Sequence, residues 1–346
     1  MKIQRGPMPV AFFGIAVGSL ALVNAWRVAA RLWPVPEAVV DVLTFAAIAT
    51  WLVILLTYAR KWLLHRAEAQ AEMRHPVQSS FAALGPVSSM LAAIALISYD
   101  RPVALALFGV AVVAQLALGV FLQGRLWQGG RPPELVTPAI YLPTVAPGFV
   151  AGAGFAAFGW PQAGMLFFGA GMLSWLALES LILLRAAVHD PLPDALRPTL
   201  GIQLAPPVVG GIAWMSLTTG TPDLFAQILL GYGLFQALLL LRLVPWIRTQ
   251  SITPSWWGFS FGVGALPTMA MRMVERGATG PVEWLAPVLF VIANVVIGIF
   301  IVKTVSLLVQ GKLLPAIPAA GGDAGNAGNA GNATVVQLPV RHTQFK

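Results

Sequence analysis

Ionisable side chains are rare within the long apolar stretches of this sequence, so those that occur there are the first candidates for chemistry. Those singled out within such stretches are Asp41, Glu179, Arg242, Arg272 and Lys303. Of these, only Glu179 is expected away from the end of its stretch. A charge inside an apolar span typically marks an ion path or a proton relay. Glu179 is therefore a candidate coupling residue, and the alternative is a paired or hydrogen-bonded carboxylate with a structural role.

The remaining reactive residue types give no indication of an enzyme. The sequence has no Cys, and its four His lie in polar connections or the tail, with no second metal ligand at helical spacing. It also lacks a Gly-rich phosphate loop, a nucleophile elbow, a His-Glu-x-x-His motif and a pair of carboxylates on one apolar helix. We therefore expect no catalytic activity, no cofactor and no metal site.

The composition is that of a membrane protein. Of 346 residues, 58% are hydrophobic and 10% are charged, whereas soluble domains have about 25% charged residues. A membrane helix needs about 20 apolar residues. Ten stretches of roughly that length occur: 9–29, 38–59, 78–98, 102–123, 138–158, 162–185, 198–219, 222–243, 255–274 and 283–309. The sequence thus predicts an all-α integral membrane domain of ten transmembrane helices over 1–314, followed by a disordered tail over 315–346, where Gly-Asn-Ala repeats occur.

The distribution of basic residues predicts the orientation. With a cytoplasmic N-terminus, 16 of the 21 Lys and Arg residues fall in segments on the cytoplasmic side. Because positively charged loops stay cytoplasmic, we expect both termini in the cytoplasm. This topology also accounts for the net charge of +8. No soluble module with a basic face is apparent, so we expect no nucleic-acid partner.

The prolines reveal an internal repeat of one helical hairpin. Pro7, Pro76, Pro138, Pro198 and Pro254 begin the odd-numbered stretches at intervals of 56 to 69 residues. The odd-numbered stretches are also rich in Gly and carry further prolines, which we expect to kink the helices: Pro86, Pro147, Pro206 and Pro267. Kinked helices need neighbouring protein or water to satisfy freed carbonyls. The pattern predicts five hairpins, with five kinked inner helices around a central pore and five outer helices. The alternative is that Gly and Pro serve ordinary close packing in membrane helices.

The predicted inner helices offer hydroxyls and aromatic rings, and we expect no acidic or basic ring on them. The candidate pore-lining residues are Phe12, Phe81, Phe149, Phe259, Ser260 and Gly262. A neutral pore lined by hydroxyls and helix dipoles, in a basic protein, suits a permeant anion better than a cation.

Several motifs, in conserved order along residues 10–310, carry a resemblance to a known family. They are Phe12-Phe13-Gly14-Ile15, Leu126-Trp127-Gln128-Gly129-Gly130, Leu166-Phe167-Phe168-Gly169-Ala170-Gly171-Met172, Gly201-Ile202 through Ala205-Pro206, Gly231-Tyr232-Gly233, Leu241-Arg242-Leu243-Val244-Pro245-Trp246-Ile247 and Phe259-Ser260-Phe261-Gly262. Together they resemble the family of tellurite-resistance TehA proteins, plant slow anion channels and C4-dicarboxylate transporters.

The resemblance implies a homotrimer in the bacterial cytoplasmic membrane, with one pore in each protomer. It also implies a pore plugged by an inner-helix Phe, and the matching position here is Phe261. The neighbouring Gly258, Gly262 and Gly264 would leave its ring room to move, whereas the alternative is a Phe that simply packs in the core. The expected function is a gated channel for small monovalent anions. The alternatives are a proton-coupled exporter of C4-dicarboxylates or oxyanions such as tellurite or sulfite, and a membrane scaffold that transports nothing.

Overall fold

The computed structural model describes residues 6–249 and 253–315, and every regular element in those two ranges is a helix. The tail predicted over 315–346 lies, apart from its first residue, outside the described residues. In chain order the elements are η1 (Val10–Phe12), α1 (Phe13–Leu32), α2 (Glu37–Leu64), α3 (Arg66–Arg74), α4 (Gln78–Ala82), α5 (Leu84–Leu96), α6 (Arg101–Trp127), η2 (Pro133–Leu135), η3 (Pro138–Tyr141), α7 (Val145–Ala157), α8 (Pro161–Val188), η4 (Asp194–Leu204), α9 (Ala205–Leu217), α10 (Leu224–Ile247), η5 (Pro254–Phe259), α11 (Ser260–Glu275) and α12 (Pro281–Val309).

Nine helical segments within the described ranges are long and apolar enough to cross a membrane. They correspond to nine of the ten predicted spans, so the prediction of an all-helical membrane protein is confirmed. The tenth predicted span, 255–274, forms η5 and α11, which are not among the nine. Ser, Thr, Arg and Glu side chains interrupt the apolar residues of α11.

Burial alternates along the chain, as the repeat predicts. In the segments that contain α1, α5, α7 and α9, 72% or 78% of the most apolar window is buried within the protein. In α2, α6, α8, α10 and α12 the buried share is only 22% to 33%. The second group leaves large apolar side chains exposed, among them Leu63, Val120 and Leu166. Apolar surfaces of that extent are suited to lipid.

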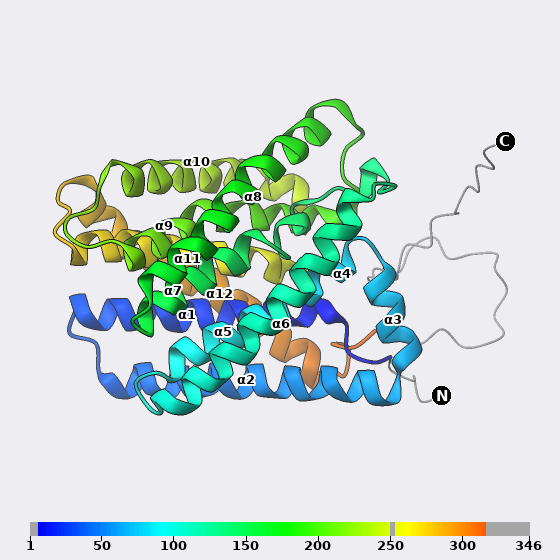
Figure 1. Cartoon of the computed structure of the whole chain (residues 1–346), viewed down its shortest axis with the longest axis horizontal. Coiled ribbons are helices and arrows are strands. Elements are labelled where there is room, and N and C mark those ends of the chain that lie inside the picture. Colours follow the sequence, from blue (N-terminus) through cyan, green and yellow to red (C-terminus); the bar gives the residue numbers. More distant parts are fainter. Residues whose placement is uncertain (1–5, 250–252, 316–346) are drawn as a thin grey trace, which may run out of the picture.

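The buried helices contact one another in a closed order. α1 contacts α5, α5 contacts α7, α7 contacts α9, α9 contacts α11, and α11 returns to α1. Each of these helices also packs against the long helix that follows it in sequence. Figure 1 shows α2 and α10 at opposite edges of the molecule, with α6 and α8 running obliquely between them. A short helical turn, one of η1, α4, η3, η4 and η5, precedes each of the five buried helices.

Glycines allow the closest of these contacts. A Cβ added to Gly148 on α7 would lie 2.7 Å from the Cα of Gly171 on α8, so only glycine permits the two backbones to approach there. A Cβ on Gly18 of α1 would lie 2.5 Å from the Cβ of Ser260 at the start of α11. The ring is therefore closed by a contact that an alanine would obstruct.

The two ends of the described chain meet. The backbone N–H of Gly6 donates a hydrogen bond to the carbonyl of Pro315 at 2.8 Å. Both ends therefore lie at the same end of the helical assembly.

Candidate functional site

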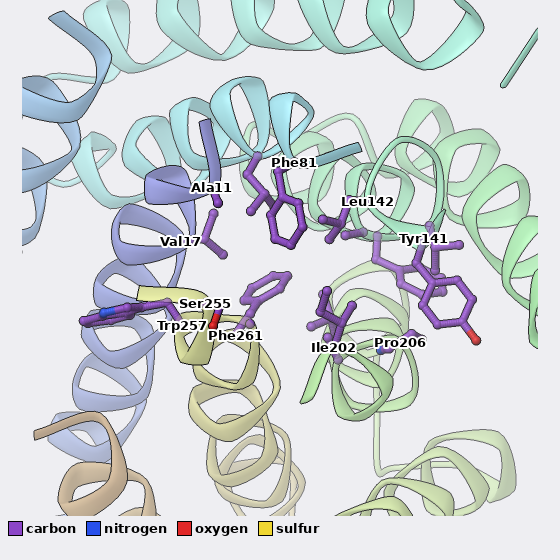
Figure 2. Close-up of a pocket in the computed structure, with 18 of the residues that line it drawn as sticks. Ala11, Val17, Phe81, Tyr141, Leu142, Ile202, Pro206, Ser255, Trp257 and Phe261 are labelled. Atoms are coloured by element: carbon purple, nitrogen blue, oxygen red, sulfur yellow. The ribbon is translucent and has the colours of Figure 1, made fainter. Parts of the chain in front are cut away.

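Two cavities meet at Phe261, inside the ring of buried helices. The first, which we call the apolar cavity, has a volume of ≈ 30 Å³ and is lined by Phe81, Tyr141 and Ile202 among other residues. The second, which we call the arginine-lined cavity, has a volume of ≈ 390 Å³. Phe149, Val209 and Phe261 line both cavities. Figure 2 shows the Phe261 ring extending from α11 into the space across from Phe81. A partition of only a few side chains thus separates the two cavities.

The backbone around Phe261 is fixed by close packing of its glycine neighbours. A Cβ on Gly262 would lie 2.7 Å from the Cβ of Leu204, and one on Gly264 would lie 3.0 Å from the Cβ of Ala21. These glycines let α11 approach η4 and α1 rather than leave free space for the ring, contrary to the expectation from sequence. Gly258, in contrast, does line the apolar cavity.

The predicted pore-lining residues separate into two groups. Phe81 and Phe149 line the cavities, as does Phe261. The other four, Phe12, Phe259, Ser260 and Gly262, are buried and line neither cavity. The Phe259 ring stacks on Trp256, with ring centroids 5.5 Å apart, and Ser260 Oγ donates to the carbonyl of Trp257 at 2.7 Å. Sequence periodicity could not separate Phe259 from Phe261, because the two residues lie on either side of the junction between the 3-10 helix η5 and the α-helix α11, where the number of residues per turn changes.

The predicted kink prolines occupy two kinds of position. Pro86, Pro147 and Pro206 lie in the first turn of α5, α7 and α9 respectively, where a backbone N–H has no partner within the helix. They therefore fit the start of an α-helix after a short turn. Only Pro267 lies in the interior of its helix, α11, where a helical hydrogen bond is lost.

Glu179 on α8 accepts hydrogen bonds from three side chains. The donors are the Tyr141 hydroxyl, the Trp175 indole at 3.0 Å and the Tyr232 hydroxyl at 3.0 Å. Gln236 in turn donates to the Tyr232 oxygen at 2.8 Å. The carboxylate lines neither cavity, but it fixes Tyr141, which lines the apolar one. Among the residues described, no three His, Asp or Glu side chains come together where a metal ion could bind.

Three arginines line the other cavity, and of these the sequence analysis singled out only Arg272. Arg27 and Arg31 lie on the last turns of α1, and Arg272 lies on α11. No basic ring was expected on the inner helices, and the sequence did not predict this cluster of arginines. The cluster was missed because α1 continues to Leu32, beyond the end of the predicted stretch 9–29, and so brings Arg31 beside Arg27. Their spacing of four residues places them on one helix face, which is the signal that could have identified them.

Comparison with known proteins agrees with this architecture. The model of the voltage-dependent anion channel family matches residues 7–305. The tellurite resistance protein TehA homolog of Haemophilus influenzae is 36% identical over 307 residues, covering 88% of this chain and 92% of the relative. The S-type anion channel SLAH3 of Arabidopsis thaliana is 24% identical over 307 residues, covering 86% of this chain and 48% of the relative. The guard cell S-type anion channel SLAC1 of the same plant is 21% identical over 310 residues, covering 86% and 55%. The resemblance inferred from the sequence motifs is thus confirmed, and the chain belongs to the voltage-dependent anion channel family.

Proposed function

We propose that this protein is a gated anion channel whose pathway runs through the ring of buried helices. The pathway leads from the arginine-lined cavity, past Phe261, to the apolar cavity. The observation that carries the proposal is that the Phe261 side chain lines both cavities. A Phe ring offers a passing ion no hydrogen bond, so it both narrows and dewets the path at that point. Relatives whose names denote S-type anion channels support the choice of anions.

We propose ten transmembrane helices in five hairpins, with α11 as the tenth. The hydrogen bond between Gly6 and Pro315 supports this count, because a chain whose ends meet on one side must cross the membrane an even number of times. The excess of Lys and Arg on the side of the termini supports a cytoplasmic location for both ends. The assembly is a homotrimer in the bacterial cytoplasmic membrane, with one pathway in each protomer.

Ion selectivity tests the proposal directly. The arginine-lined cavity has three guanidinium groups and no Asp or Glu among its lining residues, so cations are repelled. We expect chloride and nitrate to carry current in voltage-clamped bilayers containing the purified protein. Under a potassium chloride gradient, the reversal potential should lie near the chloride value. A reversal potential near the potassium value would overturn the proposal, and no current under any gradient would favour a non-transporting scaffold.

The alternative is a proton-coupled exporter of C4-dicarboxylates or oxyanions, for which Glu179 is the candidate proton carrier. The contacts of Glu179 support the channel, since three donors hold its carboxylate and it lines neither cavity. Proteoliposomes with an imposed pH gradient and no anion gradient separate the two functions. A channel should accumulate no dicarboxylate or oxyanion under that gradient, whereas accumulation that Glu179→Gln abolishes would establish the exporter.

A further inference from the structure

The arginine-lined cavity concentrates positive charge where the helices alone would favour a cation. It lies at the C-terminal ends of α1, α5, α9 and α11, as its lining residues Arg31, Ala95, Ser216 and Arg272 show. The carbonyl end of a helix carries a partial negative charge. The guanidinium groups of Arg27, Arg31 and Arg272 reverse the sign of the field there. No acidic residue among those described lines the cavity.

Arg272 has spare hydrogen-bonding capacity at the wall of this cavity. Its Nη1 donates to Ser216 Oγ at 2.7 Å and to the Ile212 carbonyl at 3.3 Å, both of which are neutral acceptors. Its Nε is buried and has no hydrogen-bond partner among the described residues. A buried N–H without a partner is costly, so it indicates an acceptor that is absent from the protein itself.

Arg27 also has only neutral contacts within the described part of the chain. Its Nη2 donates to the carbonyl of Ala95 at 2.6 Å, and its guanidinium lies 5.8 Å from the centroid of the Tyr99 ring. Neither contact neutralises the charge. Two of the three arginines that line the cavity therefore form no ion pair within the described residues.

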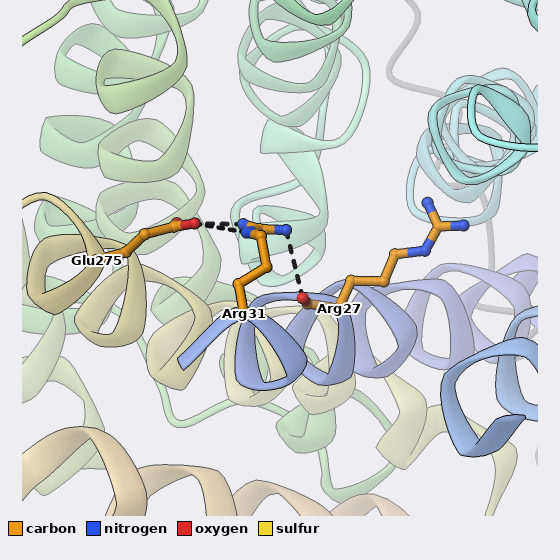
Figure 3. Close-up of polar contacts among 3 residues, drawn as sticks. All are labelled: Arg27, Arg31 and Glu275. Carbon is orange, nitrogen blue, oxygen red and sulfur yellow. Dashed lines mark hydrogen bonds and ion pairs between the residues drawn. The ribbon is translucent and has the colours of Figure 1, made fainter. Parts of the chain in front are cut away.

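The third arginine is engaged by Glu275, as Figure 3 shows. Arg31 Nε lies 2.5 Å from Glu275 Oε1, and Arg31 Nη2 lies 3.2 Å from Oε2, so the pair is bidentate. The two side chains are 51% and 29% exposed. An ion pair with that much water contact is weak and readily exchanged. Glu275 lies outside the cavity lining, at the point where Arg31 enters it.

We propose that the arginine-lined cavity is an anion-binding vestibule. Arg27 and Arg272 hold a small monovalent anion there by charge-assisted hydrogen bonds. Glu275 is a tethered competitor, because its carboxylate occupies Arg31 until the anion takes its place. The proposal deepens the proposed function, since the anion held there is the one that next passes Phe261, but the binding can be measured without any flux.

Thermal unfolding of the purified full-length protein in detergent measures the binding. Sodium nitrate replaces sodium gluconate at constant ionic strength, and a ligand that binds only the folded protein raises the midpoint saturably. We expect this rise in the unmodified protein and at least a threefold weaker nitrate affinity in Arg27→Gln and in Arg272→Gln. Arg101→Gln is the matched control, because Arg101 lies at the same end and outside the cavity lining, and it bonds the Phe158 carbonyl. If Arg272→Gln does not fold, Arg27→Gln alone decides the result.

Removal of the Glu275 carboxylate tests whether it competes with the anion for Arg31. Glu275→Gln should lower the half-saturating nitrate concentration at least threefold, whereas Glu37→Gln, which alters an exposed carboxylate at the start of α2, should leave it unchanged. Equal nitrate affinity in Arg27→Gln, Arg101→Gln and the unmodified protein would overturn the vestibule, even if the protein conducts anions. Arginine-dependent nitrate binding without any current would support the vestibule and overturn the channel instead.

Discussion

Truncation of Phe261 is the sharpest test of the barrier between the two cavities. Phe261→Ala removes a half-buried ring that borders both the ≈ 30 Å³ and the ≈ 390 Å³ cavity. The space left by the ring would join existing cavities rather than form a sealed void. The cost in stability should therefore be the transfer free energy alone, about 1.5–3 kcal/mol.

Phe259→Ala, two residues away, is the matched control. The Phe259 ring is 6% exposed and fills the contact against Gly201, where an added Cβ would lie 2.3 Å from ring atoms. Its removal should leave a sealed cavity and cost about 3–5 kcal/mol. It should not raise conductance, because the ring lines neither cavity.

The expected conductances follow from the hydration of the ion. An anion that passes the Phe261 ring loses water contacts and gains no hydrogen bond, and even a neutral polar group left without a partner costs about 2–7 kcal/mol. Removal of even about 1.4 kcal/mol of that barrier gives a tenfold rise in rate. We therefore expect Phe261→Ala to raise chloride conductance at least tenfold in voltage-clamped bilayers, at equal protein density. Unchanged conductance in a Phe261→Ala protein that is folded at the assay temperature and keeps its oligomeric state would refute the reasoning.

Three further predictions concern the supports of the site. Glu179→Gln should keep chloride conductance within about twofold but lower the unfolding midpoint, because hydrogen bonds to a charged group contribute about 1.5–3 kcal/mol each; conductance abolished in a well-folded variant would contradict this. Gly18→Ala should destabilise the protein by about 1–3 kcal/mol, since the new methyl meets the side chain of Ser260, and Gly231→Ala, where nothing lies within 4 Å of the added Cβ, is the control in the same unfolding assay. Burial and, secondarily, Arg131 lower the pKa of His75, so the unfolded chain binds a proton that the folded chain does not, and stability should fall as pH drops below about 6.5. His75→Asn keeps an acceptor for the N–H groups of Val77 and Gln78. In unfolding midpoints measured between pH 5 and 8, this variant should show a smaller fall in stability at low pH than the unmodified protein. An unchanged pH profile would show that His75 does not cause the fall.

The repeat of prolines and glycines predicted the alternation of buried and exposed helices because lipid and protein interiors impose different compositions. The same pattern could not give the ring order, since the contact of α1 with α11 joins the two ends of the sequence. The pattern also did not identify the role of the glycines near Phe261, because that role depends on how closely the backbone of α11 approaches η4 and α1. Composition shows that a residue is small, but it does not show what approaches it.

Charged residues at the ends of spans were the least predictable part of the site. Arg27 lies at the end of the predicted stretch 9–29 and Arg31 follows it, and both positions are also typical of residues near a connecting link. The continuation of α1 to Leu32 brings Arg31 to the cavity beside Arg27. Hydropathy identifies the apolar residues that can lie in lipid, but a helix can continue past them, as α1 does.

The contact of α1 with α11 has a consequence for biosynthesis. Hairpins can enter the membrane one after another as the chain emerges from the ribosome, but α1 meets its last partners only after α11 and α12 have been made. The Trp26 indole, for example, donates a hydrogen bond to Asn294 at 2.8 Å, and the two residues are 268 positions apart in the sequence. Pairings of such high contact order form late. A nascent chain that ends before α11 therefore contains α1 without its closing neighbour, so the ring of buried helices cannot close before α11 has been made.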